Sequence, residues 1–362
     1  MRKLIDLRKK VKCIDQKIIT LIYQRLTLTR KIGREKKKLG IPLQDWNVEK
    51  GVIENAMKCA EKIGMDSNFT RSLITSLIEQ SRIQQEKFHY STYSGSRENI
   101  LVIGGLGAMG RWLAYFLQNQ GHSVGICDIK QRGIKGFVYY TNLKDALTGK
   151  TVVFIATPLS LVPEIIDRLC ESKCKAVVCD IASIKSHLIP AVKRAIKNGV
   201  KITSIHPMFG PSTHTLADKV VCLCDCGSNI ANQKILNFFK DTAVKIINLS
   251  FDEHDRLVSY VLGLSHFINI LFVNTLIKSG YDFGELNRIS STTFNSQLKT
   301  TLSVVQENPE LYYEIQTLNP YNKNIFRNVN SSLDNLIKIV KKNQKNEFKR
   351  IFTNGSEWLN GY

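Results

Sequence analysis

The spacing of hydrophobic residues divides the chain into three consecutive parts. Up to about residue 90, apolar residues recur every three or four positions, which is a helical period. From Asn99 onward, short apolar runs alternate with helical stretches, a pattern that predicts a doubly wound, mostly parallel sheet. From Asp252 to the end the period is again helical. We therefore expect an all-α domain at 1–90, a linker at 91–98, an α/β domain at 99–250 and an all-α domain at 251–362.

Individual elements can be placed within these parts. The first part predicts three helices, over about 4–39, 47–63 and 68–90. The middle part predicts seven strands, which begin near residues 100, 122, 151, 175, 201, 219 and 243. The most apolar helical stretch, Val258–Ile277, carries too many polar side chains for a lone membrane-spanning helix. We expect this stretch to be buried in protein at a subunit interface.

The first predicted helix has a regular apolar seam that one arginine interrupts. The seam residues, spaced by three and four, are Leu4, Leu7, Val11, Ile14, Ile18, Leu21, Arg25, Leu28 and Ile32. A guanidinium among apolar side chains is costly unless an anion meets it. Arg8 and Lys36 lie on a strip beside the seam, and Arg8 lies about 25 Å from Arg25 along a helix. Two antiparallel copies would bring Arg8 of one chain toward Arg25 and Lys36 of the other. This geometry favours a homodimer with shared sites for a small polyanion, although a plain coiled coil with an arginine that reaches solvent explains the same pattern.

Composition narrows the compartment and the partners. The 362 residues include 51 Lys+Arg against 31 Asp+Glu, and the net charge of +20 suits nucleic acid, an anionic membrane or acidic small molecules. The charged segment Met1–Lys12 lacks the apolar region of a secretory signal, so we expect a cytoplasmic protein with reduced cysteines. Cys222, Cys224 and Cys226 alternate as in a buried strand rather than pairing as zinc knuckles, and no metal site is expected.

A glycine-rich turn in the middle part has the context of a dinucleotide site. It reads Gly105-Leu106-Gly107-Ala108-Met109-Gly110, follows the strand at 100–103 and opens a predicted helix. Glycines here allow a tight turn and close backbone approach to a pyrophosphate at the helix N-terminus. The next strand ends at Asp128, whose carboxylate can bind ribose hydroxyls and would repel a 2′-phosphate. These residues predict a Rossmann domain that binds NAD rather than NADP, a preference that Lys130 and Arg132 weaken.

Two polar segments follow later strands. They are Asp180-Ile181-Ala182-Ser183-Ile184-Lys185 and His206-Pro207-Met208-Phe209-Gly210-Pro211. The carboxyl ends of parallel strands meet at one edge, where open α/β sheets bind their ligands. His206 at such a strand end suits acid–base chemistry near neutral pH. Four other histidines are interpreted as structural residues: His122, His187, His214 and His254.

The N-terminal part resembles a known enzyme family. The run LRKKVKCIDQKIITLIYQRLTLTRKIGREKKKLGIP, followed by DWNVEK and ending in EQSRIQQ, is similar to the all-helical chorismate mutase domain over nearly all of residues 1–90. The resemblance implies a pericyclic rearrangement of chorismate to prephenate, which requires neither a nucleophile nor a metal. It also implies that Arg25 and Arg8, the latter donated by the partner chain, hold the two carboxylates of chorismate.

The same resemblance assigns roles to five more residues. Lys36 and Gln85 would bind the ether oxygen of the breaking C–O bond, and Glu49 would bind the ring hydroxyl. Asp45 and Ser81 are implied nearby. The implied catalysis is positioning, together with donors aimed at the negative charge that develops on the ether oxygen.

The remaining parts resemble prephenate dehydrogenase, most strongly in GGLGAMG, DIASIK and HPMFGP. A mutase followed by a dehydrogenase is the order of the bifunctional T-proteins of tyrosine biosynthesis. The resemblance implies oxidative decarboxylation of prephenate to 4-hydroxyphenylpyruvate with hydride transfer to NAD. His206 would take the proton, or a strong hydrogen bond, from the ring hydroxyl, Ser183 would orient His206, and Lys185 would add a charge to the substrate site. The C-terminal all-α domain would form the homodimer and close the site, and tyrosine is a candidate feedback inhibitor.

Three positions depart from these families. Val48 stands where the mutases usually have a carboxylate-binding arginine, just before Glu49. Asn295 and Ser303 stand where the dehydrogenases usually have arginines. Lys299, one helical turn before Ser303, is a candidate replacement for substrate binding, although a lysine lacks the fork of a guanidinium.

Other interpretations stay open. The Rossmann and helical parts also suit another β-hydroxyacid or imine oxidoreductase with an all-helical dimer domain. A bifunctional enzyme with one weakened or decayed site has the same sequence features. The charge of +20 would suit a nucleic-acid binder, but no aromatic residues interleave the Lys-rich runs. We therefore expect neither nucleic acid nor a membrane as a partner.

Overall fold

The computed structural model describes residues 1–39, 46–90, 93, 95–130, 133–213, 216 and 219–361, without the side chains of Lys37, Trp46, Asn47 and residues 86–90. The contacts between Cα atoms divide the chain into two compact units. One unit comprises Met1–Ser183 and Pro190–Leu249, and the other comprises Ile184–Ile189 and Ser250–Tyr362. Asp45, Arg132 and His214, which the sequence analysis names, lie outside the described residues.

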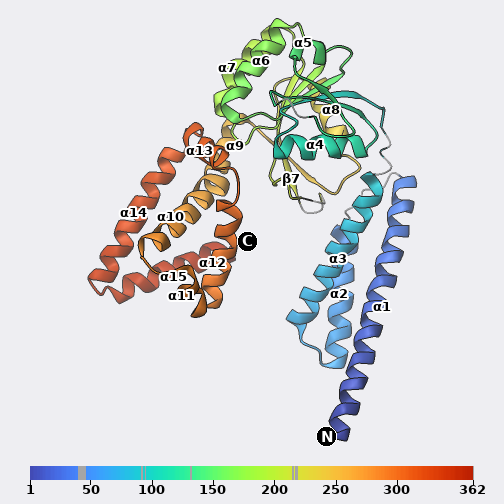
Figure 1. Ribbon diagram of the computed structural model, residues 1–362. Helices are drawn as coiled ribbons and strands as arrows, with labels where there is room; N and C mark the ends of the chain where they lie inside the picture. Colours follow the sequence, from blue (N-terminus) through green and yellow to red (C-terminus); the bar gives the residue numbers. More distant parts are fainter. Residues whose placement is uncertain are drawn as a thin grey trace. The chain divides into compact units, whose positions relative to one another are not determined.

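Three helices form the N-terminal part, as predicted. They are α1 (Arg2–Lys38), α2 (Trp46–Ile63) and α3 (Ser67–Tyr90), within two residues of the expected bounds. Helix α3 packs against both α1 and α2, and the N-terminal end of α1 extends beyond the other two helices (Figure 1). The eight apolar members of the α1 seam, Leu4 to Ile32, are 48–62% exposed. An apolar seam of this length without a cover within the protomer is typical of a helix that pairs with another chain.

An eight-stranded sheet forms the middle part. Its strands are β1 (Asn99–Ile103), β2 (Ser123–Cys127), β3 (Val138–Tyr140), β4 (Val152–Ile155), β5 (Val177–Asp180), β6 (Ile202–Pro207), β7 (Val220–Cys224) and β8 (Lys245–Leu249). The strand order is β3-β2-β1-β4-β5-β6-β7-β8, and only the β6–β7 pair is antiparallel. The prediction of a mostly parallel sheet is confirmed. Strand β3 was missed because this edge strand is only three residues long and has no buried position.

The interior of the sheet explains why its central strands read as continuous apolar runs. Strand β4 is buried at all four positions and β1 at four of five, because helices cover the sheet on both faces. The covering helices are α4 (Ala108–Asn119), α5 (Leu143–Ala146), α6 (Val162–Glu171), α7 (Ile189–Lys197) and α8 (Asn229–Asn237), and the short turn η1 (Leu159–Leu161) precedes α6. The short turn η2 (Ser186–Leu188) belongs to the second unit. The strand order reverses between β1 and β4. A crevice for a ligand is expected at the carboxyl ends of these two strands.

The second unit is built from helices, as predicted. They are α9 (Phe251–Val258), the π-helical stretch η3 (Ser259–Leu264), α10 (Ser265–Lys278), α11 (Phe283–Arg288), α12 (Thr292–Val305), α13 (Pro309–Leu318), α14 (Asn322–Lys341) and α15 (Lys345–Asn360). The first three form one continuous helix, Phe251–Lys278, and among the described residues it alone is long and apolar enough to cross a membrane by length and composition. One such helix is weak evidence for a membrane span. Only 17% of its apolar window is buried within the protomer, so the expected burial of this stretch is not reached in a single chain.

Candidate active sites

The arginine of the α1 seam bonds to helix α3. Arg25 donates from Nη1 to the Ser81 hydroxyl at 2.6 Å and to the Leu77 carbonyl at 2.8 Å. Ser81 is itself buried and donates its hydroxyl to the same carbonyl at 2.6 Å. Burial lowers the pKa of Arg25 from its ordinary value. The structure therefore brings together two residues that are 56 positions apart and that the resemblance assigns to one site.

Gln85 lies next to Arg25's helix, one turn beyond Ser81 on the same face of α3. Its side chain is buried and lies against Gly33 of α1. A Cβ at Gly33 would lie 3.0 Å from Cγ of Gln85, so this approach depends on a residue without a side chain. Lys36 follows three residues after Gly33 on α1 and is half-buried. Gln85 thus belongs to the α1–α3 contact, and Lys36 lies one helical turn from it along α1.

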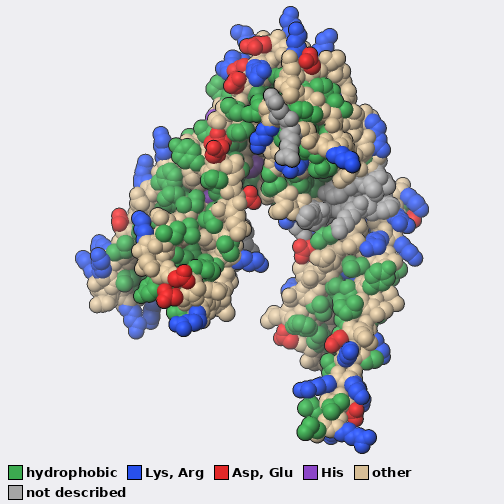
Figure 2. All heavy atoms as spheres, viewed as in Figure 1, with side chains coloured by type: hydrophobic (Ala, Val, Ile, Leu, Met, Phe, Trp, Pro, Cys, Tyr) green, Lys and Arg blue, Asp and Glu red, His purple; other side chains and the backbone are tan. Residues whose placement is uncertain are grey.

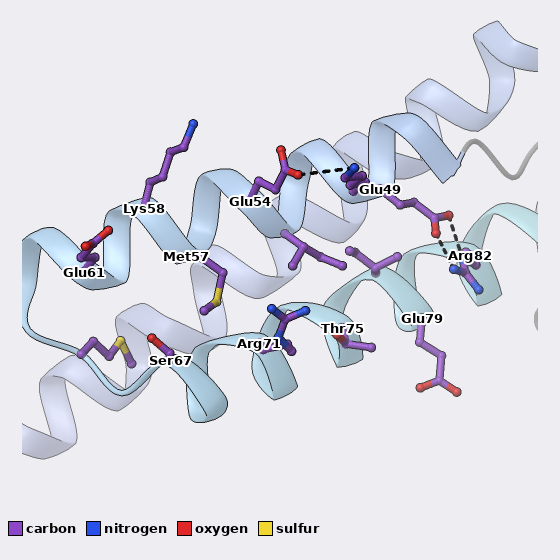
Figure 3. A pocket seen from close by; sticks show the side chains of 14 residues that line it. Glu49, Glu54, Met57, Lys58, Glu61, Ser67, Arg71, Thr75, Glu79 and Arg82 are labelled. Carbon is purple, nitrogen blue, oxygen red and sulfur yellow. Dashed lines mark hydrogen bonds and ion pairs between the residues drawn. The ribbon is translucent and has the colours of Figure 1, made fainter. Parts of the chain in front are cut away.

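Glu49, at the start of α2, forms an ion pair that the sequence did not predict. Arg82 on α3 donates from Nε to Glu49 Oε1 at 3.0 Å and from Nη2 to Oε2 at 2.5 Å. The side chains of Arg82 and Glu49 are only 12% and 17% exposed. Figure 3 shows these two side chains pointing toward each other between the two helices. The only sequence signal for Arg82 is that it directly follows Ser81.

The Glu49–Arg82 pair lines one end of a pocket between α2 and α3. The pocket has a volume of about 1190 Å³ and is lined by charged and apolar side chains, among them Ile53, Met57, Arg71 and Ile78 (Figure 3). Arg8 is not part of this neighbourhood. It is exposed on α1, 17 residues before Arg25, which corresponds to about 25 Å along a helix.

The glycine-rich turn lies at the carboxyl end of β1, where the strand order reverses. Added Cβ atoms would come 2.7 Å from Ile126 Cγ2 at Gly105 and 2.3 Å from the Gly104 carbonyl oxygen at Gly110. Gly104, which precedes the predicted cofactor residues, has a φ of +77°, a conformation that favours glycine. Gly107 is exposed and is the N-cap of α4. The turn thus offers bare backbone at a helix N-terminus and fits a dinucleotide pyrophosphate.

Asp128 stands beside this turn, directly after β2. Its Oδ2 accepts the backbone N–H of Leu106 at 3.0 Å, and its Oδ1 accepts that of Lys130 at 3.1 Å. The carboxylate is therefore fixed against the turn formed by residues 104–110, at the place where a ribose of a dinucleotide would lie. Ala108 and Met109, the first residues of α4, complete the predicted cofactor set on this turn.

His206 and Ser183 are positioned by two neighbouring parallel strands. His206 lies near the end of β6, and Ser183 comes three residues after the end of β5. Asp180, the last residue of β5, pairs with Ser204 of β6, so Ser183 and His206 both lie near the carboxyl edge of the sheet. His206 is 4% exposed. The segment after His206 packs on α4: the Phe209 ring lies 5.0 Å from that of Trp112, and Trp112 donates from Nε1 to the Thr213 carbonyl at 2.8 Å. This packing brings the HPMFGP segment to the helix that follows the glycine-rich turn.

Lys185 belongs to the second unit, together with Glu253-His254-Asp255 of α9. Its side chain is fully buried, and its backbone N–H bonds to the Asp255 carboxylate. His254 is fully buried, with Nδ1 2.7 Å from Asp255 Oδ1. The sequence placed Asp255 in the helical part expected to form the dimer and close the site, but nothing in the local pattern around it points to residue 185. Lys299, Asn295 and Ser303 lie four residues apart on α12 and are all exposed.

Three family models match successive parts of the chain. Residues 7–86 match chorismate mutase type II, residues 113–248 match the nucleotide-binding domain of prephenate dehydrogenase, and residues 250–354 match its dimerization domain. The fold predicted from the resemblance is confirmed. The domain boundaries at 90, 98 and 250 stay predictions.

Individual relatives agree with this division. The T-protein of Enterobacter agglomerans is 23% identical over 357 residues, which cover 99% of this chain and 93% of the relative. The chorismate mutase of Methanocaldococcus jannaschii is 30% identical over 98 residues, which cover 27% of this chain and 99% of the relative. A crystal structure of prephenate dehydrogenase from A. aeolicus, in complex with hydroxyphenyl propionate and NAD+, has the same fold, with a TM-score of 0.57 and 20% identity over 70% of this chain and 94% of that one. The chain belongs to the T-protein family and is a bifunctional enzyme, with a chorismate mutase domain followed by the two domains of a prephenate dehydrogenase.

Proposed function

We propose that the helical N-terminal domain rearranges chorismate to prephenate between α1, α2 and α3. Arg25 binds one substrate carboxylate, and Arg8 of the partner subunit binds the other. Lys36 and Gln85 donate to the ether oxygen, and Glu49 accepts from the ring hydroxyl. The observation that carries this proposal is the bond between Arg25 and Ser81, because it holds a seam arginine at α3 rather than in solvent.

This reaction needs no proton transfer and no covalent intermediate. A C–O bond breaks while a C–C bond forms, and negative charge develops on the ether oxygen. Donors that are already in place stabilise this charge without having to reorganise. The side chain of Gln85 is buried, with its Cβ and Cγ against Gly33, and is held in this way. Asp45 and Ser81 complete the proposed site, with Ser81 fixing the direction of the Arg25 guanidinium.

We propose that the Rossmann domain and the C-terminal helices oxidise prephenate. NAD+ bound at residues 105–110, with Asp128 at its ribose, supplies the hydride acceptor. His206 accepts the proton of the ring hydroxyl, Ser183 orients the His206 imidazole, and Lys185 adds positive charge near the anionic substrate. Carbon dioxide leaves and the ring becomes aromatic. Burial of His206 at 4% exposure keeps water from its imidazole and supports this role.

We further propose that the active enzyme is a homodimer. The uncovered α1 seam, 48–62% exposed, and the largely uncovered helix Phe251–Lys278 both offer apolar surface for a second copy of this chain. The match of residues 250–354 to a dimerization domain supports the second interface. We place the enzyme in the cytoplasm, with small-molecule substrates rather than nucleic acid or a membrane as its partners, and retain tyrosine as the candidate feedback inhibitor. Figure 2 shows Lys and Arg spread over the visible surface among other side chains, as expected for solvated charge.

Variants of one residue from each site test these assignments. Arg25→Ala should lose mutase activity and keep dehydrogenase activity, because the two sites share no residue. His206→Asn should do the reverse. Arg30→Ala is the matched control on α1, since Arg30 is exposed and bonds Gln84 at 3.0 Å. If both activities fell together in each variant, the assignment to two separate sites would be wrong. A wild-type chain that turns over only one of the two substrates would instead support the alternative with one decayed site.

A further inference from the structure

Arg82 is the nearest described cation to the carboxylate that is proposed to bind the ring hydroxyl of chorismate. It extends from α3 to α2 and meets both oxygens of Glu49 with its Nε and Nη2. Ser81 precedes it in sequence, and Gln85 lies one turn beyond. Arg82 therefore occupies the same part of α3 as two proposed site residues, although the mutase resemblance assigns it no role.

The charge of Glu49 makes a nearby cation necessary. Chorismate carries two carboxylates, and a third carboxylate in a partly buried site repels them. Glu49 is 17% exposed, so water screens this repulsion only weakly. A bidentate guanidinium neutralises Glu49 and also fixes the plane of its carboxylate. Both effects favour a dianion whose hydroxyl must meet Glu49 in one orientation.

Position 48 lacks the cation that the mutase resemblance implies. Val48 directly precedes Glu49 on α2 and is 58% exposed. Arg82 reaches the Glu49 carboxylate from the opposite helix, so it brings a positive charge to the residue that directly follows Val48 (Figure 3). We propose that Arg82 is a substrate-specificity residue of the mutase site, which orients Glu49 and supplies the positive charge that Val48 does not. This inference rests on the proposed mutase function.

A purely structural role for the pair makes different predictions. An ion pair that only joins α2 to α3 would affect folding of the helical domain, and an arginine at position 48 would not replace it. A role in substrate binding instead affects KM for chorismate and can be restored by a cation introduced from α2. The two roles can therefore be separated by comparing thermal stability with KM and kcat.

The experiment compares four full-length variants with the wild type, using chorismate as the substrate. Arg82→Val should raise KM for chorismate on the order of 30-fold, the loss expected for a charge-assisted hydrogen-bonded pair. Arg82→Lys keeps the charge but loses the fork and should raise KM by about fivefold. Val48→Arg combined with Arg82→Val should return KM to within about threefold of the wild type. Arg71→Ala is the matched control, because Arg71 lies three turns before Arg82 on α3, is not one of the proposed substrate-binding residues and should leave KM unchanged.

Circular dichroism melts of each variant show whether the helical domain is folded. If Arg82→Val does not fold, the Arg82→Lys variant decides the question by its KM. An unchanged KM in Arg82→Lys and Arg82→Val would overturn the inference while leaving the mutase function intact. Failure of an arginine at position 48 to restore KM would overturn the claim that Arg82 supplies the missing charge. A wild-type protein without mutase activity would overturn both this inference and the function on which it rests.

Discussion

The carboxylate of Asp255 binds the backbone of Lys185, which precedes it by 70 residues. The N–H of Lys185 lies 2.9 Å from Oδ1 and 3.1 Å from Oδ2, and the N–H of Ser186 lies 2.6 Å from Oδ2. Asp255 is fully buried. Helix α9 therefore anchors the turn that begins directly after Ser183, at the point where the chain leaves the sheet for the helical unit. We expect this anchor to hold Ser183 at a fixed distance from His206.

Asp255→Asn tests the anchor, because an amide has only one oxygen to accept the two N–H groups. We expect a loss of about 1–3 kcal/mol in the free energy of unfolding and a lower dehydrogenase kcat. Mutase activity should not change. Urea unfolding and both activity assays measure these effects. Asp252→Asn is the control on the same helix, since Asp252 is exposed, and it should alter stability by less than about 0.5 kcal/mol. Equal losses in both variants would contradict the special role of Asp255.

The same carboxylate predicts a pH dependence. Burial by itself raises the pKa of Asp255, but hydrogen bonds from His254, Ser186 and Lys185 outweigh it and leave the pKa below its ordinary value. The stabilisation is therefore fully present above the ordinary pKa of about 4 and is lost as the pH falls through the lowered pKa of the folded state. Urea unfolding of the wild type and of Asp255→Asn should show a difference in stability that shrinks below about pH 4. A difference that grows with acid would have the wrong sign.

His122 predicts a second pH dependence, which arises because burial keeps this side chain neutral in the folded protein. Burial, followed by the charge of Arg97, lowers the pKa of His122 to about 4, and its Nδ1 accepts the N–H of Glu98 at 3.1 Å. Below about pH 6.5 the unfolded chain binds a proton that the folded chain does not, so stability falls as the pH drops from about 6.5 toward 4. The loss is on the order of 3 kcal/mol. In thermal melts, His122→Asn, which keeps an acceptor but cannot titrate, should reduce this slope. An unchanged slope would show that His122 is not its source.

A shared mutase site predicts complementation between two inactive variants. Arg8→Ala and Arg25→Ala should each lack mutase activity as homodimers. When the two chains are co-expressed, half of the dimers are mixed, and each mixed dimer has one intact site. Mutase activity should then recover to about a quarter of the wild-type value, as the symmetry of a two-fold dimer requires. Mixed dimers without any recovered activity would contradict donation of Arg8 from the partner.

The departures on α12 predict a dependence on Lys299. If Lys299 replaces the arginines missing at Asn295 and Ser303, Lys299→Ala should raise KM for prephenate about tenfold without changing kcat. Adding Ser303→Arg to that variant should lower KM again, because an arginine one turn later restores a cation on the same face of α12. An unchanged KM in Lys299→Ala would count against compensation by this lysine.

The elements of secondary structure that could be predicted from the sequence are those with a regular local pattern of apolar residues. The three N-terminal helices, seven of the eight strands and the helical C-terminal part follow from periods of 3.6 and 2 and from their breaks. Strand β3 did not, because a short edge strand with half-exposed side chains has no such period. Gly104 belongs to the GGLGAMG run but was left out of the cofactor residues, since its positive φ and its close approach to Ala156 are visible only in the folded turn.

Candidate site residues also could be predicted only where a local sequence pattern marks them. The glycine-rich turn and His206 could be found because a strand end gives them a context in the sequence. The contacts of Arg82 and Asp255 could not be found, because their partners Glu49 and Lys185 are 33 and 70 residues away. Pairings of this kind exist only once the helices have packed. They leave no period or spacing that a single sequence can reveal.

The most direct test of a bifunctional chain is a coupled assay with one purified protein. Chorismate and NAD+ are supplied without added prephenate, and NADH absorbance is followed while prephenate is measured in parallel without NAD+. We predict that prephenate forms in the absence of NAD+ and that NADH appears from chorismate in its presence. In Arg25→Ala, NADH should appear only when prephenate is added. A wild-type protein that turns over neither substrate would contradict the account.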